Sequence, residues 1–348
     1  MKDEKEILGL TGLRFVAAFY VFLFHIHIRW PLVGPGFLSN VLNQGAVGMS
    51  IFFLLSGFVL AYRYQDGRTG LRDYLVNRFA RIYPVYVIAA LVTLPWFGIS
   101  FGDGSIGDVA RGAAQGALLL FANIFLIQAW FPQFFSLWNV GGSWSISVEA
   151  FCYLLLPVIL PALSRLTWRQ QKGVAIACLI LASLPGISAK LFETPSAGVF
   201  YFMPIFRLPE FVLGCIVCIA WAGRRVRAPG TSLQLCIVVA FVAYLGFAGP
   251  ALPVYVGHNW VALPFIAGAT LCLAFGRGAF AAVLSTPLFV WLGKISYSFY
   301  SFQALLILFL IARHDQLVSA YPWLANNWAL CGVAFLALTA MSAAGRLC

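Results

Sequence analysis

The chain has 348 residues, of which 62% are hydrophobic and only 9% are charged, and its formal net charge is +11. A soluble domain has about a quarter of its residues charged, so this composition excludes a soluble globular protein. The basic charge does not indicate a nucleic-acid-binding protein either, because no nucleic-acid-binding module interrupts the apolar segments. The sequence instead predicts an all-α, polytopic transmembrane helix bundle.

Apolar runs of about 20 residues, the length that crosses a bilayer as a helix, recur along the whole chain. The first run has no small-residue cleavage site, so we interpret it as a retained span and not as a signal peptide. No long polar linker or internal repeat divides the chain, which predicts a single integral membrane domain over residues 1–348. The ten predicted spans are 7–28, 45–63, 82–99, 143–163, 173–188, 199–222, 232–249, 259–276, 295–312 and 323–343.

One further apolar segment, residues 113–130, decides the topology. If it crossed the membrane there would be eleven spans, and every later loop would change sides. We interpret it as a re-entrant or interfacial helix, because most basic loop residues then lie on one side of the membrane. By the positive-inside rule this predicts that both termini are cytoplasmic. The membrane that we expect is a bacterial cytoplasmic (inner) membrane. The other side keeps only Arg29, Arg111, Lys190 and Arg313.

Eight cysteines are scattered through the apolar segments, without paired loop spacing or accompanying histidines. Metal sites built from cysteine show closely paired residues at fixed spacing, and we interpret the one such pair, Cys215 and Cys218, as a chance CxxC within a helix. We therefore interpret these cysteines as small core residues and predict no metal site.

The first span carries ionisable residues that are costly in lipid. A charge at the centre of a span costs about 2.5 to 3.5 kcal/mol, so such residues face the interior of a bundle. Arg14 and His25 are eleven residues apart, which places them on one helix face about 16 Å apart along the axis. Arg14 is then in the cytoplasmic third and His25 in the outer third. His27 points about 200° away from His25, and we predict it at the surface.

A polar stripe marks the fourth predicted span, in which Ser145, Glu149 and Tyr153 are spaced by four residues on an otherwise apolar helix. If Ser143 lies at the outer surface, Glu149 is about 9 Å below it. That depth matches the predicted depth of His25. We expect the stripe to face a polar partner.

Six sequence motifs follow one another in an order that resembles a known family. They are LTGLRFVAAFYVFLFH with Arg14 and His25 as R-x10-H, GMSIFFLLSGFVLAY, RFARIYPVY with Arg78 and Arg81 as RxxR, SWSISVEAFCYLLLP, FRLPEFVLG, and LGKISYSFYSFQ. Together they resemble the acyltransferase 3 family of integral membrane O-acyltransferases. The chain departs from the family pattern at Gln303, where many members have a histidine, and in its last residues, ALTAMSAAGRLC, which lack a Glu-Lys-Pro-like ending.

The resemblance implies transfer of an acyl group, commonly acetyl, from cytoplasmic acyl-CoA to a hydroxyl of a carbohydrate or other acceptor. Acyl-CoA is then a co-substrate, and no permanently bound cofactor is expected. The acceptor implied is an exopolysaccharide or a lipopolysaccharide, reached across the membrane. We expect the pantetheine arm to enter from the cytoplasm past Arg14 and the acceptor to enter from outside.

Such a transfer requires a base, a group that stabilises the oxyanion, and a cationic seat for the CoA phosphates. We predict His25 as the base and Glu149 as the carboxylate that orients it. Arg14 would steady the thioester. Arg78 and Arg81, at the start of the third span, would bind the phosphates of CoA. Substrate binding is assigned to five further polar residues, Ser145, Tyr153, Arg207, Glu210 and Tyr300.

Each assignment has a structural alternative. The histidine would be a buried residue bonded to the backbone, the glutamate would balance an arginine, and the RxxR arginines would be anchors at the cytoplasmic face. Arg207 and Glu210, three residues apart, would form an ion pair within one helix. The alternative function is a transporter or flippase of a saccharide or lipid-linked sugar. Against it, the sequence shows no inverted repeat or paired broken helices.

Overall fold

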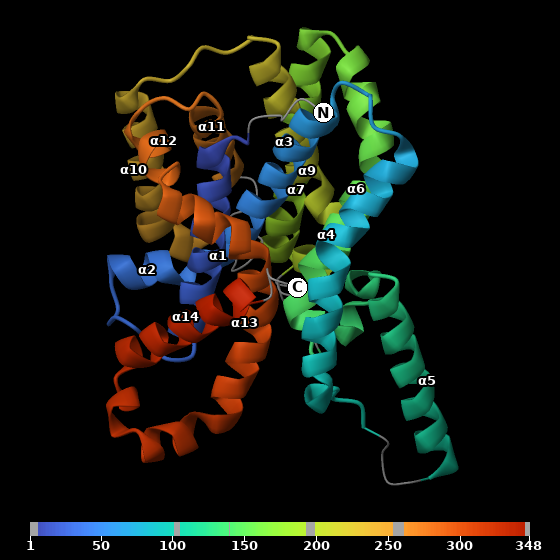
Figure 1. Ribbon diagram of the computed structural model, residues 1–348. Helices are drawn as coiled ribbons and strands as arrows, with labels where there is room; N and C mark the ends of the chain where they lie inside the picture. Colours follow the sequence, from blue (N-terminus) through green and yellow to red (C-terminus); the bar gives the residue numbers. More distant parts are fainter. Residues whose placement is uncertain (1–5, 101–104, 139, 193–198, 253–260, 345–348) are drawn as a thin grey trace.

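The computed structural model describes residues 6–100, 105–138, 140–192, 199–252 and 261–344. In these ranges the chain forms helices and no strand (Figure 1), which confirms the predicted all-α bundle. Within the same ranges, nine helical segments are long and apolar enough to cross a membrane. The helices of these segments are α1 (Leu8–His27), α3 (Gly48–Tyr64), α4 (Leu71–Val92), α6 (Val140–Arg165), α7 (Trp168–Leu191), α9 (Pro204–Ala222), α10 (Thr231–Ala243), α13 (Pro287–Ala320) and α14 (Asn327–Ala344).

Within the described residues, five further helices lie between or next to these segments. They are α2 (Phe37–Asn43), α5 (Ile106–Ile124), α8 (Val199–Phe202), α11 (Ala262–Ala274) and α12 (Ala279–Leu284). The predicted span at 259–276 corresponds to α11, whose 13 residues are fewer than the roughly 20 that a full crossing needs. The beginning of that predicted span lies outside the described residues.

Two spans extend beyond their apolar runs. α4 begins at Leu71, before the predicted start at 82, because its polar first turns continue the same helix. α13 has 34 residues, about 51 Å at 1.5 Å per residue, so it reaches past both ends of the predicted span at 295–312.

The segment 113–130 forms most of α5 and the 3-10 turn at Gln128–Trp130. α5 does not belong to the nine segments found in the described ranges. Figure 1 shows it at the edge of the molecule, away from α1 and α3. That this segment does not cross the membrane stays a prediction.

α3 and α9 cross closely at the centre of the bundle. A Cβ atom on Gly57 of α3 would lie 2.0 Å from the Phe211 carbonyl oxygen, and one on Gly214 of α9 would lie 1.9 Å from the Leu54 carbonyl oxygen. Because these distances are too short for any side chain, only glycine fits at both positions. Such small residues allow two helix backbones to approach closely in a membrane.

α1 and α13 lie side by side and parallel, and this arrangement positions the site. At one end, Lys294 Nζ of α13 lies 3.4 Å from a carboxylate oxygen of Glu6. At the other end, the ring of Trp30 stacks on His314, with centroids 5.5 Å apart. Their common direction agrees with the predicted topology, in which the first and ninth spans run the same way.

Seven cysteines fall within the described ranges, and all seven are free. Six are buried, in line with the interpretation as core residues, whereas Cys236 on α10 is exposed. Within the same ranges, no three or more His, Cys, Asp or Glu side chains lie together in a group that could hold a metal ion.

Candidate active site

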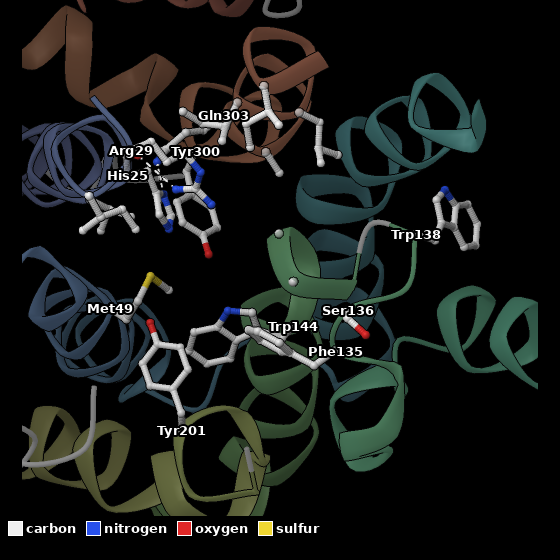
Figure 2. Close-up of a pocket in the computed structure, with 18 residues that line it drawn as sticks. His25, Arg29, Met49, Phe135, Ser136, Trp138, Trp144, Tyr201, Tyr300 and Gln303 are labelled. Carbon is white, nitrogen blue, oxygen red and sulfur yellow. Dashed lines mark hydrogen bonds between the residues drawn. The ribbon is translucent and has the colours of Figure 1, made fainter. Parts of the chain in front are cut away.

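A cavity of about 360 Å³, here called the wide cavity, lies between α1, α6, α8 and α13. Its walls are largely apolar and aromatic with a few polar groups, as is typical of ligand sites. Figure 2 shows His25, Tyr300 and Gln303 together on one side of this cavity. The other side carries Met49, Trp144 and Tyr201.

His25 projects from α1 into the wide cavity and is held by α13. Its Nδ1 lies 2.6 Å from Nε2 of the Gln303 side-chain amide. The other amide atom, Gln303 Oε1, is buried and has no hydrogen-bond partner. A contact at Nδ1 leaves Nε2 of the imidazole as the ring nitrogen available to a substrate.

Tyr300, one turn before Gln303 on α13, also lines the wide cavity. Ser145 Oγ of α6 donates a hydrogen bond to the Tyr300 hydroxyl oxygen at 3.0 Å. Because the tyrosine oxygen accepts this bond, its own proton remains available for donation. Figure 2 shows the hydroxyl of Tyr300 pointing into the cavity.

A second cavity of about 40 Å³, the narrow cavity, adjoins the wide cavity and shares Met49 and Tyr300 with it. Its polar lining includes Arg14, Arg81 and Glu149. Arg14 interacts electrostatically with both of the other two. The polar partner expected for the stripe on α6 is therefore this group of arginines, together with Tyr300.

Glu149 lies beside Arg14 and not beside His25. Its carboxylate accepts hydrogen bonds from the Tyr153 hydroxyl at 2.9 Å and from the Ser56 hydroxyl at 3.4 Å. Across the described ranges, the side-chain hydrogen bond on His25 comes from Gln303. The orienting contact predicted for Glu149 is thus made by another residue.

Ser143, from which the predicted depth of Glu149 is counted, is enclosed by other parts of the protein. Ser143 is 1% exposed, and its carbonyl and hydroxyl oxygens accept hydrogen bonds from Gln128 of the preceding 3-10 turn. That turn covers the start of α6, and the depths of Ser143 and Glu149 in the membrane stay predictions.

A third cavity of about 770 Å³, the basic cavity, adjoins the narrow cavity and shares Arg14 and Arg81 with it. Two further arginines, Arg63 and Arg68, contribute to its wall. Arg68 lies 3.4 Å from the carboxylate of Asp66. The basic, narrow and wide cavities therefore form a row, in which each neighbouring pair has residues in common.

The two arginines of the RxxR motif point into different surroundings. Arg81 is exposed and lines both the basic and the narrow cavity. Arg78 is only 5% exposed, and its guanidinium lies over the rings of Tyr64 and Tyr153, at 5.5 and 6.0 Å from their centroids. Of the predicted phosphate-binding pair, the structure places only Arg81 in the basic cavity.

Arg207 and Glu210 form the intrahelical ion pair that their spacing allows, with Nη1 and Oε1 2.9 Å apart. Both side chains are enclosed, at 1% and 0% exposure. Arg207 also lies over the rings of Trp144 and Tyr201, at 5.6 and 4.8 Å. These two rings line the wide cavity, and neither residue of the ion pair lines it. The rings therefore separate the ion pair from the cavity, and the structure does not place Arg207 and Glu210 in the direct contact with substrate that was predicted.

His27 is buried and not at the surface, with 3% exposure. Its Nδ1 accepts a hydrogen bond from the backbone N–H of Leu32 at 3.0 Å, and its Nε2 lies 3.0 Å from Ser39 Oγ. The chain turns back after α1 and covers this ring, which a helical wheel of α1 alone does not reveal.

Comparison with known proteins identifies the family. The model of a family described as "Acyltransferase domain" matches residues 7–346. The chain belongs to the acyltransferase 3 family.

Three proteins with acyltransferase names are similar to the chain. Acyltransferase MdmB of Streptomyces mycarofaciens is 26% identical, and the match covers 97% of this chain and 87% of MdmB. The putative peptidoglycan O-acetyltransferase YrhL of Bacillus subtilis is 24% identical over 86% of this chain, and O-acetyltransferase OatA of Staphylococcus aureus is 25% identical over 91%. The chain spans about half the length of YrhL and OatA, at 48% and 53%. No solved structure matches the chain.

The protein is therefore an integral membrane acyltransferase. Within its site, sequence reasoning gave Gln303 no role, although an amide within an apolar span signals a buried polar contact. Met49, Trp144 and Tyr201 were also missed. They are ordinary apolar or aromatic residues of spans, and no pattern in the sequence distinguishes cavity walls from helix contacts.

Proposed function

We propose that this acyltransferase moves an acetyl group from acetyl-CoA on the cytoplasmic side to a hydroxyl of a carbohydrate acceptor that enters from outside. The observation that carries the proposal is the row of cavities, which leads from four arginines to His25. The names of OatA and YrhL support acetyl as the group, and the peptidoglycan named for YrhL supports a carbohydrate acceptor. Exopolysaccharide and lipopolysaccharide belong to the same chemical class.

The basic cavity suits the phosphates of CoA. Guanidinium groups bind phosphate oxygens through paired, charge-assisted hydrogen bonds, and Arg14, Arg63, Arg68 and Arg81 all line this cavity. The phosphates stay there because charge is costly within the bilayer. Only the uncharged pantetheine arm then extends through the narrow cavity, and its thioester reaches the wide cavity.

Gln303 determines which nitrogen of His25 carries the proton. If the amide N–H donates to Nδ1, the neutral ring holds its proton on Nε2 and is not a base toward the cavity. If the amide is turned, Oε1 accepts the Nδ1–H and the Nε2 lone pair faces the substrate. The turned arrangement also gives the buried Oε1 the partner that it otherwise lacks. We assign it to the active enzyme.

The reaction then needs only groups of this chain. His25 Nε2 takes the proton of the acceptor hydroxyl, and the oxygen attacks the thioester carbonyl. The tetrahedral intermediate collapses as the carbon–sulfur bond breaks, and His25 returns the proton to the thiolate of CoA. The products are the acetyl ester and free CoA. The Tyr300 hydroxyl, oriented by Ser145, stabilises the oxyanion of the intermediate.

Glu149 and Arg14 act in the narrow cavity. A carboxylate beside two arginines reduces the positive charge that would otherwise stand within the membrane. Glu149 also fixes the Tyr153 hydroxyl through its hydrogen bond. We assign both residues to guiding the pantetheine arm and steadying the thioester.

Sealed vesicles of known orientation test the arrangement. With both termini cytoplasmic in the inner membrane, acetyl-CoA should be used only when it is supplied on the cytoplasmic face, and acceptor only on the other. His25→Ala should insert normally while turnover falls about a hundredfold or more, the usual effect of losing a general base. Equal activity with both substrates on one face would make the enzyme one-sided, and near-normal turnover of His25→Ala would remove the base assignment.

A further inference from the structure

A fourth cavity of about 360 Å³, the side cavity, lies outside the row that leads to His25. It is formed by the end of α3, the start of α4 and the end of α6. It shares Asp66 and Thr69 with the basic cavity. The segment between α3 and α4 thus forms a common border between arginines on one side and the side cavity on the other.

We propose that the side cavity binds the adenine ring of the donor, an inference that rests on CoA being the donor. A purine has two flat apolar faces and an edge of hydrogen-bonding nitrogens. The walls from α6 include the apolar side chains of Leu156, Leu160 and Pro161, and the border segment supplies polar groups of Gln65 and Thr69. This combination matches a ring held between apolar faces and bonded at its edge.

The order of the four cavities matches the order of groups in CoA. Adenine, phosphates, pantetheine and thioester follow one another in the molecule. The side, basic, narrow and wide cavities follow one another through shared residues, which are Asp66 and Thr69, then Arg14 and Arg81, then Met49 and Tyr300.

The aromatic wall of the side cavity is rigid. The rings of Tyr64 and Tyr74 meet edge to face with centroids 4.8 Å apart. The Tyr74 hydroxyl donates to the Tyr153 carbonyl oxygen at 2.8 Å, and the Arg78 guanidinium packs over the Tyr64 ring. Arg78, enclosed and without a place in the basic cavity, thereby supports the wall of the side cavity. A preformed wall lowers the entropic cost of binding a flat ring.

The test compares two donors in variants that fill the side cavity. Ser164 on α6 and Leu71 on α4 both line it and are exposed, and the Ser164 hydroxyl donates to the Leu160 carbonyl oxygen of its own helix. Ser164→Trp and Leu71→Trp should each raise KM for acetyl-CoA about tenfold, the effect of losing one base stack. KM for acetyl-4′-phosphopantetheine, which lacks adenosine, should not change. Ala162→Trp, on an exposed position of α6 two residues from Ser164, is the matched control and should behave as wild type.

Calorimetric measurement of CoA and 4′-phosphopantetheine binding distinguishes the proposal that CoA is the donor from the proposal that the side cavity binds its adenine ring. If wild-type protein binds neither, CoA is not the donor and the proposed function fails. If it binds CoA and the two Trp variants bind CoA equally well, the side cavity holds something else, such as a lipid chain, and the adenine assignment alone is overturned. Equal losses with both donors in both variants would also overturn it, because the region would then support the fold.

Discussion

Three pairs of ionisable residues in this bundle consist of the same residue type in different surroundings. In each pair, one side chain lines a cavity and the other is enclosed by protein. The pairs are His25 and His27, Arg81 and Arg78, and Glu149 and Glu210. The enclosed members contact protein groups that hold them in place, which are a backbone N–H, two tyrosine rings and an arginine. The members that line cavities keep a charge or a lone pair directed at space that a substrate can fill.

This difference shows that an intramembrane charge is not by itself a sign of catalysis. Arg207 and Glu210 pair with each other one turn apart on α9, so part of the cost of burying the two charges is offset locally. Arg207 Nη2 and Glu210 Oε2 make no hydrogen bond within the described residues. Glu149 has no such partner on its own helix apart from a tyrosine hydroxyl, and it lies beside arginines from α1 and α4. Charges gathered from several helices around a cavity are the stronger evidence for a site.

The largest expected effect comes from breaking the enclosed pair. Glu210→Gln leaves Arg207 as an unpaired buried charge, which costs about 3 to 5 kcal/mol, so the yield of folded protein and Tm in detergent should both fall. Glu149→Gln should leave Tm nearly unchanged and lower turnover. Measuring Tm and activity on both variants separates stability from catalysis.

The double variant Arg207→Met with Glu210→Leu provides the control, because removing both charges leaves neither one unpaired. It should regain most of the lost stability. If Glu210→Gln instead keeps its Tm and loses activity, the enclosed pair belongs to the site and the comparison with Glu149 does not hold.

The sequence predicts much of this fold because runs of apolar residues report directly on spans. It does not predict helix ends, since α4 begins at Leu71 and includes Arg72, Arg78 and Arg81, whose polarity interrupts the apolar run by which a span is recognised. It also does not show that Ser143 is enclosed within the protein, because that burial depends on the 3-10 turn that covers the residue.

The second largest effect is expected at Gln303. Gln303→Leu removes the acceptor that fixes the tautomer of His25, so kcat should fall about tenfold to a hundredfold, with KM for acetyl-CoA unchanged. Gln303→Glu keeps an acceptor oxygen opposite Nδ1 and should retain more activity. If the two variants are equally impaired in kcat, Gln303 acts through packing alone.

The sequence predicts which residues of one helix share a face, but it does not predict which residues of different helices meet in the site. The spacing of Arg14 and His25 correctly puts both on the interior of α1, where they line cavities. The partner of His25 is 278 positions away along the chain, and which residue of α13 meets it depends on how two helices pack. The wheel of one helix likewise cannot show that a later loop covers His27.

A smaller effect should separate the two arginines of the RxxR motif. Arg81→Ala should raise KM for acetyl-CoA about tenfold, because charge-assisted bonds to phosphate are lost, and Arg81→Lys should raise it less because the charge remains. Arg78→Lys should change KM for acetyl-CoA through the adenosine portion only, leaving acetyl-4′-phosphopantetheine unaffected. Identical profiles for the two positions with both donors would contradict the distinction between them.

The smallest effect is expected at His27, where we expect a substitution to change stability and not turnover. His27→Ala leaves the backbone N–H of Leu32 unpaired, which should lower stability by about 1 to 2 kcal/mol without changing turnover per folded molecule. His27→Asn offers an oxygen near the position of Nδ1 and should recover part of the loss. Thermal unfolding in detergent, together with kcat of the folded fraction, measures both quantities. A variant with unchanged Tm and reduced kcat would place His27 with His25 in the site, and it would end the division between enclosed and cavity-lining histidines.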